Sequence, residues 1–454
     1  MKSEVDIKDS VKKVFKAYDV RGLFPGEWDD DIARLAGNAF VQYLNAESIV
    51  IGRDMRNSSP VLAKAFCEGA IMAGAEVFDI GLASTDMLYF ASGHLNMPGV
   101  MVTASHNPAQ YNGLKMCRQM AAPIGEDSGL SQIKAAVESG ILVRHEIPGE
   151  LKEIDLANEF RDHCLSFINP KTIENLKIIA DTANGMGGYV VPKVFDKLNC
   201  KIEIMYGELD GSFPNHPADP LQAENLKDLQ NRVVETSSDI GLAFDGDADR
   251  VFLVDDMGQT MGGYLTVAMV AQSLLKKFPG ETIVYNLICS KAVPELIEKS
   301  GGIAHRTRVG HSFIKQVMAD TGAIFGGEHS GHYYFRDNYY ADSGLIAALM
   351  VLELLAESEK KLSELRKEFE PYFQSGEINS VVKSVPKSIE KVTKYFSKNE
   401  IDNLDGLTIN DGNWWANIRP SNTEPLVRLN VEAHSDELCR TKTREILEII
   451  RGEQ

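Results

Sequence analysis

Short apolar runs recur along the chain, and each ends in a loop of small or polar residues. The runs come in pairs: ESIVIGRDMRNSS and PGVMVTASHN, then LKIIADTANGMGG and DIGLAFDGDADR, then ETIVYNLICSK and AIFGGEHSGH. Helix-like stretches separate them, and short buried strands that alternate with helices are typical of parallel α/β units. The pattern therefore predicts three similar mixed α/β domains in series, in which each loop leads from a strand into a helix.

Polar stretches between these units predict the domain boundaries. GELKEID lies near residue 150 and DDMGQ near 255, and the charged helix AESEKKLSELRKEFEPY closes the third unit. From about residue 370 the pattern changes to SVVKSV, a longer segment around NWWANIRPSNTEP and a final amphipathic helix. We therefore predict domains at 1–150, 151–255, 256–369 and 370–454, of which the last is a smaller α+β domain.

Length and charge narrow the class of protein. A chain of 454 residues is too long for one hydrophobic core, so two to four domains are expected. The net charge of -18 argues against general binding to nucleic acid or to an anionic membrane. No apolar run reaches the ~18 residues of a membrane span, and the six cysteines show no CxxC spacing. We therefore expect a cytoplasmic protein with reduced thiols that binds a small molecule.

The segment DGDADR, residues 245 to 250, predicts a metal site. It follows the apolar run IGLAF directly and places Asp245, Asp247 and Asp249 at alternate positions. Three carboxylates at this spacing suit a hard divalent cation that prefers oxygen ligands, although a solvated acidic turn is the alternative. An EF-hand is excluded because VFLVDD, which follows, is typical of a strand. Arg250 beside the carboxylates predicts an anion next to the metal.

The segment TASHNP, residues 103 to 108, places a serine in a sharply punctuated loop. Taken alone, Ser105 is better explained as a helix N-cap than as a nucleophile, and the loop is not a GxSxG elbow. A serine beside a metal, however, can carry a phosphoryl group whose oxygen completes the metal shell. His106 and Lys115 can then balance its charge, and Lys115 can also move protons. With the DGDADR loop present, we predict that Ser105 is a nucleophile.

Two later loops carry groups suited to a phosphosugar. GGEHSGH offers Glu328 and Ser330, and a carboxylate next to a hydroxyl can hold adjacent sugar hydroxyls. RPSNTEP combines the guanidinium of Arg419 with three short hydrogen-bonding side chains, which suits a phosphate dianion. A glycine turn and a plain Pro-Ser-Asn turn are the respective alternatives.

Other residues give weaker signals. AYDVRG places Tyr18 and Arg21 near the first strand, and Lys291 and His311 lie in loops of the third unit. Each would be unremarkable alone. His94 and His216 have no neighbours in sequence that predict a role.

Together TASHNP, DGDADR, GEHSGH and RPSNTEP, in this order, resemble the α-D-phosphohexomutases, in particular the bacterial phosphomannomutase/phosphoglucomutase branch. The resemblance covers nearly the whole chain, including AYDVRG. It implies three similar α/β domains and a C-terminal domain related to TATA-binding-protein-like folds, arranged around a central cleft. It also implies a monomer or weak homodimer that takes a phosphosugar as substrate.

The resemblance implies a role for each matching residue. Ser105 is the phosphoserine, and it binds Mg²⁺ together with Asp245, Asp247 and Asp249. Arg250 contacts the transferring phosphoryl group, and Lys115 and His332 are candidates for proton transfer. Sugar hydroxyls are held by Glu328 and Ser330. The phosphate that does not react is held by Arg419, Ser421, Asn422 and Thr423, and supporting positions are Tyr18, Arg21, His106, Lys291 and His311.

The implied reaction interconverts hexose 6-phosphate and hexose 1-phosphate. Phosphoserine donates its phosphoryl group, a hexose 1,6-bisphosphate forms and turns around, and the serine takes back the other phosphoryl group. Positioning, Mg²⁺ and cationic side chains must then lower the barrier. Three alternatives share these loops: a phosphoglucosamine mutase, a metal-dependent sugar phosphatase that uses the same serine, and a catalytically idle phosphosugar sensor.

Overall fold

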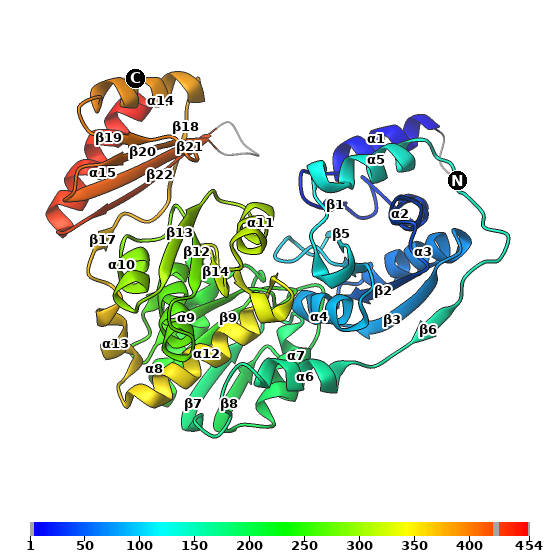
Figure 1. Cartoon of the computed structure of the whole chain (residues 1–454), viewed down its shortest axis with the longest axis horizontal. Coiled ribbons are helices and arrows are strands. Elements are labelled where there is room, and N and C mark those ends of the chain that lie inside the picture. The colour runs from blue at the N-terminus through cyan, green and yellow to red at the C-terminus, as the bar shows by residue number, and fades with distance from the viewer. Residues whose placement is uncertain (1–3, 421–425, 453–454) are drawn as a thin grey trace.

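The computed structural model describes residues 4–420 and 426–452, and for Glu4, His311 and Ser312 it describes the backbone alone. The chain forms four domains, each built on its own sheet (Figure 1). Among the described residues, no helix is long and apolar enough to cross a lipid bilayer.

Domain 1 carries a six-stranded sheet in the order β1-β5-β4-β2-β3-β6. The strands β2, β3, β4 and β6 run parallel, whereas β5 and β1 are antiparallel to their neighbours. Asp29 caps the second helix by accepting a hydrogen bond from the backbone of Ile32. The elements are α1 (Glu4–Val14), β1 (Val20–Leu23), α2 (Asp30–Leu44), β2 (Ser48–Arg53), α3 (Ser59–Met72), β3 (Glu76–Leu82), α4 (Thr85–Leu95), β4 (Gly99–Val102), β5 (Tyr111–Cys117), η1 (Gln119–Ala121), η2 (Glu126–Ser128), α5 (Leu130–Glu138) and β6 (Leu151–Glu153).

Domain 2 carries a five-stranded sheet in the order β11-β10-β9-β7-β8. All five residues of β9 and of β10 are buried, as the apolar runs on either side of DGDADR predict. The elements are α6 (Ala157–Leu165), β7 (Glu174–Asp181), α7 (Gly187–Phe195), β8 (Asn199–Met205), η3 (Ala223–Leu226), α8 (Lys227–Thr236), β9 (Ile240–Phe244), β10 (Val251–Asp255) and β11 (Thr260–Met261).

Domain 3 carries a five-stranded sheet in the order β13-β12-β14-β15-β16. Two long helices, α9 and α12, are buried along most of their length. The elements are α9 (Gly263–Lys277), β12 (Thr282–Asn286), α10 (Ala292–Lys299), β13 (Ile303–Thr307), α11 (His311–Thr321), β14 (Phe325–Gly327), β15 (Tyr333–Phe335), η4 (Arg336–Asn338), β16 (Ala341–Asp342), α12 (Gly344–Ser358), α13 (Leu362–Leu365) and η5 (Arg366–Glu368).

The three sheets share one strand order, which confirms the predicted repeat. In the sequence β5-β4-β2-β3, the first strand is antiparallel and the other three are parallel, and β10-β9-β7-β8 and β15-β14-β12-β13 repeat it. A further antiparallel strand, β1, β11 or β16, borders each set. Strand β6 extends the first sheet to Glu153 and β11 extends the second to Met261, a few residues beyond the predicted boundaries.

The structure corrects one prediction about the loops. We expected the polar loops to lead from strands into helices, with a strand expected only after the acidic loop, but all three loops that carry the candidate chemistry join two antiparallel strands. They connect β4 to β5, β9 to β10, and β14 to β15. Each therefore lies at the same corner of its own sheet, next to the carboxyl end of the central parallel strand.

Domain 4 is a smaller α+β unit. Its antiparallel strands follow the order β17-β22-β21-β20-β19, with β18 also paired to β22. In Figure 1 it lies beside domain 3 and apart from domain 1. The elements are β17 (Phe373–Gln374), β18 (Ile378–Val381), α14 (Val385–Tyr395), β19 (Glu400–Asp402), β20 (Leu407–Asn410), β21 (Trp414–Pro420), β22 (Leu426–Ala433) and α15 (Asp436–Arg451).

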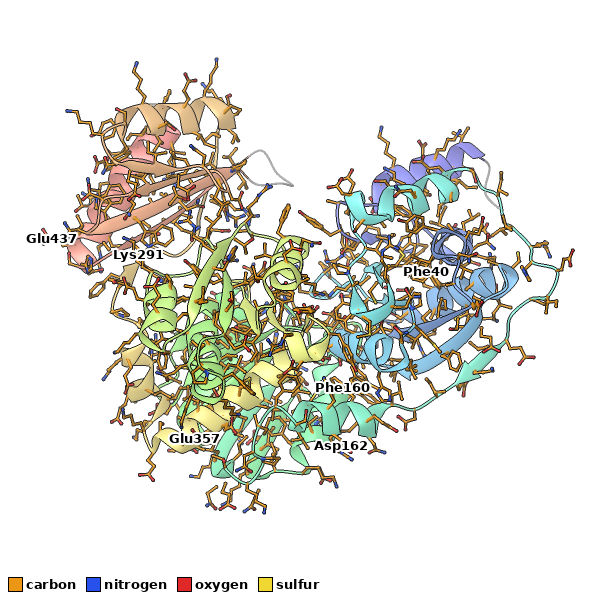
Figure 2. The ribbon with its side chains drawn as sticks, in the orientation of Figure 1. Phe40, Phe160, Asp162, Lys291, Glu357 and Glu437 are labelled. Carbon is orange, nitrogen blue, oxygen red and sulfur yellow. The ribbon has the colours of Figure 1, made fainter. Side chains whose placement is uncertain are left out.

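The buried apolar residues divide the molecule differently from the sheets. One cluster runs through domains 2 and 3 and includes part of domain 1, around α4. Figure 2 labels Phe160 of α6 on this border, and its ring centroid lies 5.8 Å from that of Phe90 in α4. Phe40 belongs to the second cluster, inside domain 1. Domain 4 has a separate cluster of its own, whereas the first cluster extends from domains 2 and 3 into domain 1 and joins these three domains.

Candidate active site

The serine loop of domain 1 spans residues 103–110, between β4 and β5. Ser105 is 4% exposed and has a φ of 49°, in the left-handed region that residues other than glycine rarely adopt. It is not a helix N-cap, because a strand follows the loop. Its Oγ donates to Asp245 Oδ2 at 2.7 Å and lies 3.2 Å from His106 Nδ1. The loop therefore aims its serine at the acidic loop of domain 2.

The acidic loop of domain 2 buries its three carboxylates together. Asp245, Asp247 and Asp249 are each at most 1% exposed, and one oxygen from each lies within 4.8 Å of the others. The Oδ1 atoms of Asp247 and Asp249 are buried with no hydrogen-bond partner among the described residues. Buried acceptors without donors are costly, and a hard cation such as Mg²⁺ prefers such oxygens. The residues present fit a magnesium site.

Two cations border these carboxylates. Lys115, on β5, places Nζ 2.8 Å from Asp247 Oδ2 and 2.5 Å from Asp249 Oδ2. Burial acts to lower the pKa of Lys115, but the two carboxylates outweigh it and hold the pKa well above its ordinary value. The Arg250 guanidinium contacts Asp245 Oδ2 through Nε at 3.1 Å and through a terminal nitrogen at 3.0 Å. Lys115 and Arg250 are therefore positive charges at the rim of the predicted metal site.

The loop between β14 and β15 brings the third group of predicted residues. Glu328 is buried, and its Oε2 accepts a hydrogen bond of 3.0 Å from Ser330 Oγ. His332 Nδ1 lies 3.2 Å from the same hydroxyl. The carboxylate, hydroxyl and imidazole thus form a short chain that ends near Asp249, because Asp249, His332 and Asp342 place one ligand atom each within 4.8 Å of one another.

These loops meet around one cavity of about 250 Å³. Seven predicted site residues line it: Tyr18, Arg21, Ser105, His106, Lys115, Arg250 and His332, together with the metal-loop residue Asp249. They come from all three α/β domains. A serine, an acidic cage and several cations around one cavity can transfer a phosphoryl group between hydroxyls, since the cage can hold a metal and the cations can neutralise phosphate charge.

Comparison with known proteins finds relatives that match the chain along nearly its whole length. Residues 12–143, 158–258, 262–372 and 377–448 match, in turn, the models of domains I, II and III and the C-terminal domain of phosphoglucomutase/phosphomannomutase. The phosphomannomutase of Escherichia coli K12 is 39% identical over 448 residues, which cover 96% of this chain and 98% of the relative. The chain belongs to the phosphoglucomutase/phosphomannomutase family. It is a phosphohexomutase, an enzyme of the isomerase class.

Other members of the family agree. The phosphomannomutase of Methanocaldococcus jannaschii is 38% identical over 441 residues, which cover 96% of this chain and 97% of the relative. A phosphoglucomutase/phosphomannomutase family protein from Burkholderia thailandensis has a solved structure that superposes with a TM-score of 0.88 at 31% identity. That match covers 99% of this chain and 98% of the solved chain. The predicted fold class and family are confirmed.

Two predicted residues of this phosphohexomutase lie away from the cavity. Lys291 donates from Nζ to Asn410 Oδ1 of domain 4 at 2.8 Å, and Figure 2 labels it at the border of domains 3 and 4. It lines a different cavity, of about 420 Å³. Arg419, on β21, pairs with Glu377 at 2.9 Å. Ser421, Asn422 and Thr423 lie outside the described residues, as does the side chain of His311, so their roles stay predictions.

Sequence reasoning missed several residues that line the phosphohexomutase cavity, among them Tyr89, Lys315 and Asp342. Lys315 is 4% exposed, its Nζ lies 3.2 Å from Asp342 Oδ1, and it packs 4.4 Å from the centroid of the Tyr89 ring. Lys315 lies on α11 and Tyr89 on α4, within ordinary amphipathic patterns. Asp342 follows a turn, and its position in ADSG, before a glycine that starts a helix, was the one available signal.

The electrostatics of the cavity favour anion binding. Burial, together with the nearby guanidinium groups of Arg250 and Arg21, lowers the pKa of His106 to about 2. With no anion bound, His106 is therefore neutral, while Lys115, Arg250, Arg21 and Lys315 supply positive charge to the wall. A phosphate group in the cavity would offset that charge.

Proposed function

We propose that this phosphohexomutase interconverts hexose 6-phosphate and hexose 1-phosphate through a phosphorylated Ser105. The observation that carries the proposal is the contact of 2.7 Å between Ser105 Oγ and Asp245 Oδ2, which places the serine of domain 1 against the acidic cage of domain 2. A helix N-cap or a surface serine has no need of such a partner. Lys115 and Arg250 supply the positive charge that a phosphoryl group in transfer requires.

The proposed reaction has two steps. The phosphorus bond to Ser105 Oγ breaks as a bond forms to the free hydroxyl oxygen of a hexose phosphate, which gives a hexose 1,6-bisphosphate. Lys115 and His332, both at the cavity wall, move the proton of that hydroxyl to the Ser105 Oγ that leaves. After the bisphosphate turns around, Ser105 gives up this proton as it accepts the other phosphoryl group, and the proton passes to the new sugar hydroxyl.

Three aspartates would hold Mg²⁺ at this site: Asp245, Asp247 and Asp249. When bound, Mg²⁺ supplies Lewis-acid stabilisation of the charge on the phosphoryl oxygens. The side chains of the protein supply the other contributions to catalysis. Lys115 and Arg250 neutralise charge, Tyr18 and Arg21 narrow the cavity, and the burial of Ser105 keeps water from competing with the sugar hydroxyl.

For the sugar, we propose mannose and glucose phosphates over glucosamine phosphate. The intermediate must bind in two orientations, with hydroxyls 3 and 4 between its phosphate ends, so Glu328 and Ser330 can hold them in both. The C2 substituent changes place when the intermediate turns around, so the site should accept both C2 epimers, glucose and mannose. The difference in binding free energy between them should be ~1 kcal/mol, the size of one weak hydrogen bond. An ammonium at C2 would approach Lys115 and Arg250 and is disfavoured. The relatives named phosphomannomutase support mannose.

A coupled assay tests the proposal. Mannose, glucose and glucosamine 1-phosphates are compared by kcat/KM at equal Mg²⁺ and hexose 1,6-bisphosphate, and peptide mass spectrometry locates the phosphoryl group. We expect isomerisation of the first two substrates, phosphate on Ser105, and loss of nearly all turnover in Ser105→Ala. Net release of inorganic phosphate would instead identify a sugar phosphatase. Glucosamine 1-phosphate as the best substrate would show a phosphoglucosamine mutase.

A further inference from the structure

The loop that carries Ser105 has little regular hydrogen bonding of its own. Within residues 103–110, two backbone bonds close short turns, from Asn107 to Ala104 and, at the end of the loop, from Tyr111 to Pro108. Ser105 nevertheless adopts a left-handed φ, which costs about 1 kcal/mol or more for a residue with a side chain. Something outside the loop must therefore hold its backbone in this conformation.

Arg56 is the residue that contacts this backbone. It follows β2, in the segment GRDMRNSS, and is 1% exposed. One terminal nitrogen donates to the carbonyls of Ser105 at 2.7 Å and Asn107 at 2.6 Å, and the other to those of Pro108 at 2.8 Å and Tyr111 at 3.0 Å. A single side chain thus satisfies three carbonyl groups of the serine loop and the carbonyl of Tyr111, the first residue of β5.

The guanidinium is the one side chain suited to this arrangement. Its two terminal nitrogens carry four N–H groups in a fixed plane, and here four carbonyls accept from them. The fifth donor, Nε, lies 3.2 Å from Asp54 Oδ2, and both side chains are fully buried. A lysine has three donors on a flexible stem, so it would leave at least one buried carbonyl without a partner.

Domain 2 completes the packing around Arg56. The guanidinium carbon lies 5.1 Å from the centroid of the Phe213 ring. A Cβ on Gly211 would lie 2.6 Å from the Arg56 Cα, so the chain of domain 2 touches this segment directly. The Ser105 carbonyl that Arg56 binds also faces Gly246 of the acidic loop, where a Cβ would lie 2.4 Å from that oxygen. Arg56 therefore fixes the serine loop at the point where domains 1 and 2 meet.

From this geometry we infer that Arg56 is a positioning residue for the phosphoryl transfer. It holds the backbone from Ser105 to Tyr111 so that Ser105 Oγ faces Asp245, and it does so without touching the substrate. The inference rests on the proposed function, because it assigns Arg56 to the same serine. A displacement of the reacting oxygen by about 1 Å is enough to reduce turnover about 100-fold.

Three variants of the full chain test the inference. Arg56→Lys keeps the positive charge but loses the planar guanidinium group with its two donor nitrogens. Arg56→Ala leaves a space that a guanidinium ion can enter. Arg53→Lys is the matched control, since Arg53 lies three residues earlier and pairs loosely with Asp79 at 3.8 Å, and since its side chain makes no hydrogen bond or ion pair to the serine loop among the described residues. Turnover, phosphate on Ser105 and amide hydrogen exchange of residues 103–113 are measured for each.

We expect kcat to fall about 100-fold in Arg56→Lys with little change in KM, as for a displaced reacting group. Exchange should quicken in residues 103–113 and stay unchanged in the helices of domain 1. Guanidinium ions, and not potassium at equal ionic strength, should restore part of the turnover of Arg56→Ala. Arg53→Lys should match the wild type.

Several results would overturn the inference. They are full turnover in Arg56→Lys, exchange that rises equally throughout domain 1, loss of the whole fold in both Arg56 variants, or no response of Arg56→Ala to guanidinium. A wild-type protein with no phosphate on Ser105 and no mutase turnover would instead refute the proposed function. The two failures are therefore distinguishable.

Discussion

At the residue scale, the carboxylate of Asp247 shows how one charged group depends on its neighbours. Asp247 is fully buried, and its Oδ2 accepts hydrogen bonds from Lys115 and from Thr85 Oγ1, while Oδ1 points at no donor among the described residues. The carboxylate is thus held by two elements of domain 1 and leaves one oxygen for a cation. Its position depends on contacts that cross a domain border.

We predict that Asp247→Asn loses most turnover and most affinity for divalent cations. The amide keeps the size of the side chain but removes the charge that a hard dication requires. The expected loss of turnover is about 100-fold or more, and titration calorimetry with Mg²⁺ measures the affinity. Asp256→Asn, at the opposite end of β10 and outside the cage, serves as a control. Unchanged Mg²⁺ affinity in Asp247→Asn would show that the metal binds elsewhere.

His216, which showed no signal in the sequence, forms a partly buried pair with Asp181 in the structure. Its Nε2 lies 3.0 Å from Asp181 Oδ2 and its Nδ1 lies 2.9 Å from the carbonyl of Pro217. Both partners are acceptors, so both ring nitrogens must carry protons. Burial acts to lower the pKa of His216, but the hydrogen bond and charge of Asp181 outweigh it and raise the pKa.

The raised pKa makes the contribution of His216 to stability depend on pH. It is fully present below the unfolded pKa of about 6.5 and is lost as pH rises through the higher folded pKa. We predict that His216→Gln lowers the free energy of unfolding by about 1 to 3 kcal/mol at pH 5.5 and by less at pH 9. Thermal unfolding at both values measures it, with the exposed His305→Gln as control. If the difference in free energy of unfolding between the wild type and His216→Gln increased with pH, the raised pKa of His216 would be contradicted.

At the scale of elements, the active site depends on two loops that approach without side chains between them. The backbone of Gly246, in the acidic loop, lies against the Ser105 carbonyl, so that an added Cβ would meet that oxygen at 2.4 Å and the Ala218 Cβ at 3.4 Å. Both loops leave the same corner of their sheets, which is why they meet. The glycine in DGDADR therefore allows the close approach of two domains.

We predict that Gly246→Ala reduces turnover about 100-fold while the protein stays folded, because the methyl group pushes the serine loop away from the acidic cage. The matched control is Gly125→Ala, in domain 1, where the nearest atom to an added Cβ lies 3.7 Å away. Steady-state kinetics and circular dichroism provide the measurements. Equal turnover in the two variants would mean that the loops are further apart than the structure shows.

The sequence predicted the elements of this site well and their connections poorly. Aspartates at alternate positions directly after a buried strand predict the acidic cage. Carboxylates gathered at the end of a buried strand need a cation, and this holds in any fold. VFLVDD was predicted as a strand, but an apolar run does not reveal the direction of its strand. The strand after the serine loop was missed because YNGLKMC mixes polar and apolar residues. Arg56, Thr85 and Lys315 were missed for a different reason. Their partners are carbonyls and carboxylates 27 to 162 positions away, which no local pattern encodes.

At the scale of the whole molecule, the three α/β domains act as one body and domain 4 as another. The largest apolar cluster joins domains 1, 2 and 3, whereas domain 4 keeps its own cluster, which includes Trp414, Ile418 and Leu429. The contacts between domains 3 and 4 that we find are polar, such as Lys291 with Asn410 and Tyr372 with Glu295. Domain 4 can therefore change its tilt without exposing a shared core, as a domain that closes over substrate requires.

The separate core of domain 4 predicts that the protein unfolds in two thermal steps. Cooperative unfolding follows shared packing, so calorimetry should resolve two transitions, of which the smaller belongs to domain 4. Leu429→Ala, a truncation inside that cluster, should lower the smaller transition by several degrees and leave the larger one in place. One transition that moves as a whole would show that the domains unfold together. Moderate heat would thus unfold the domain predicted to bind the distal phosphate while the serine and its acidic cage stay assembled.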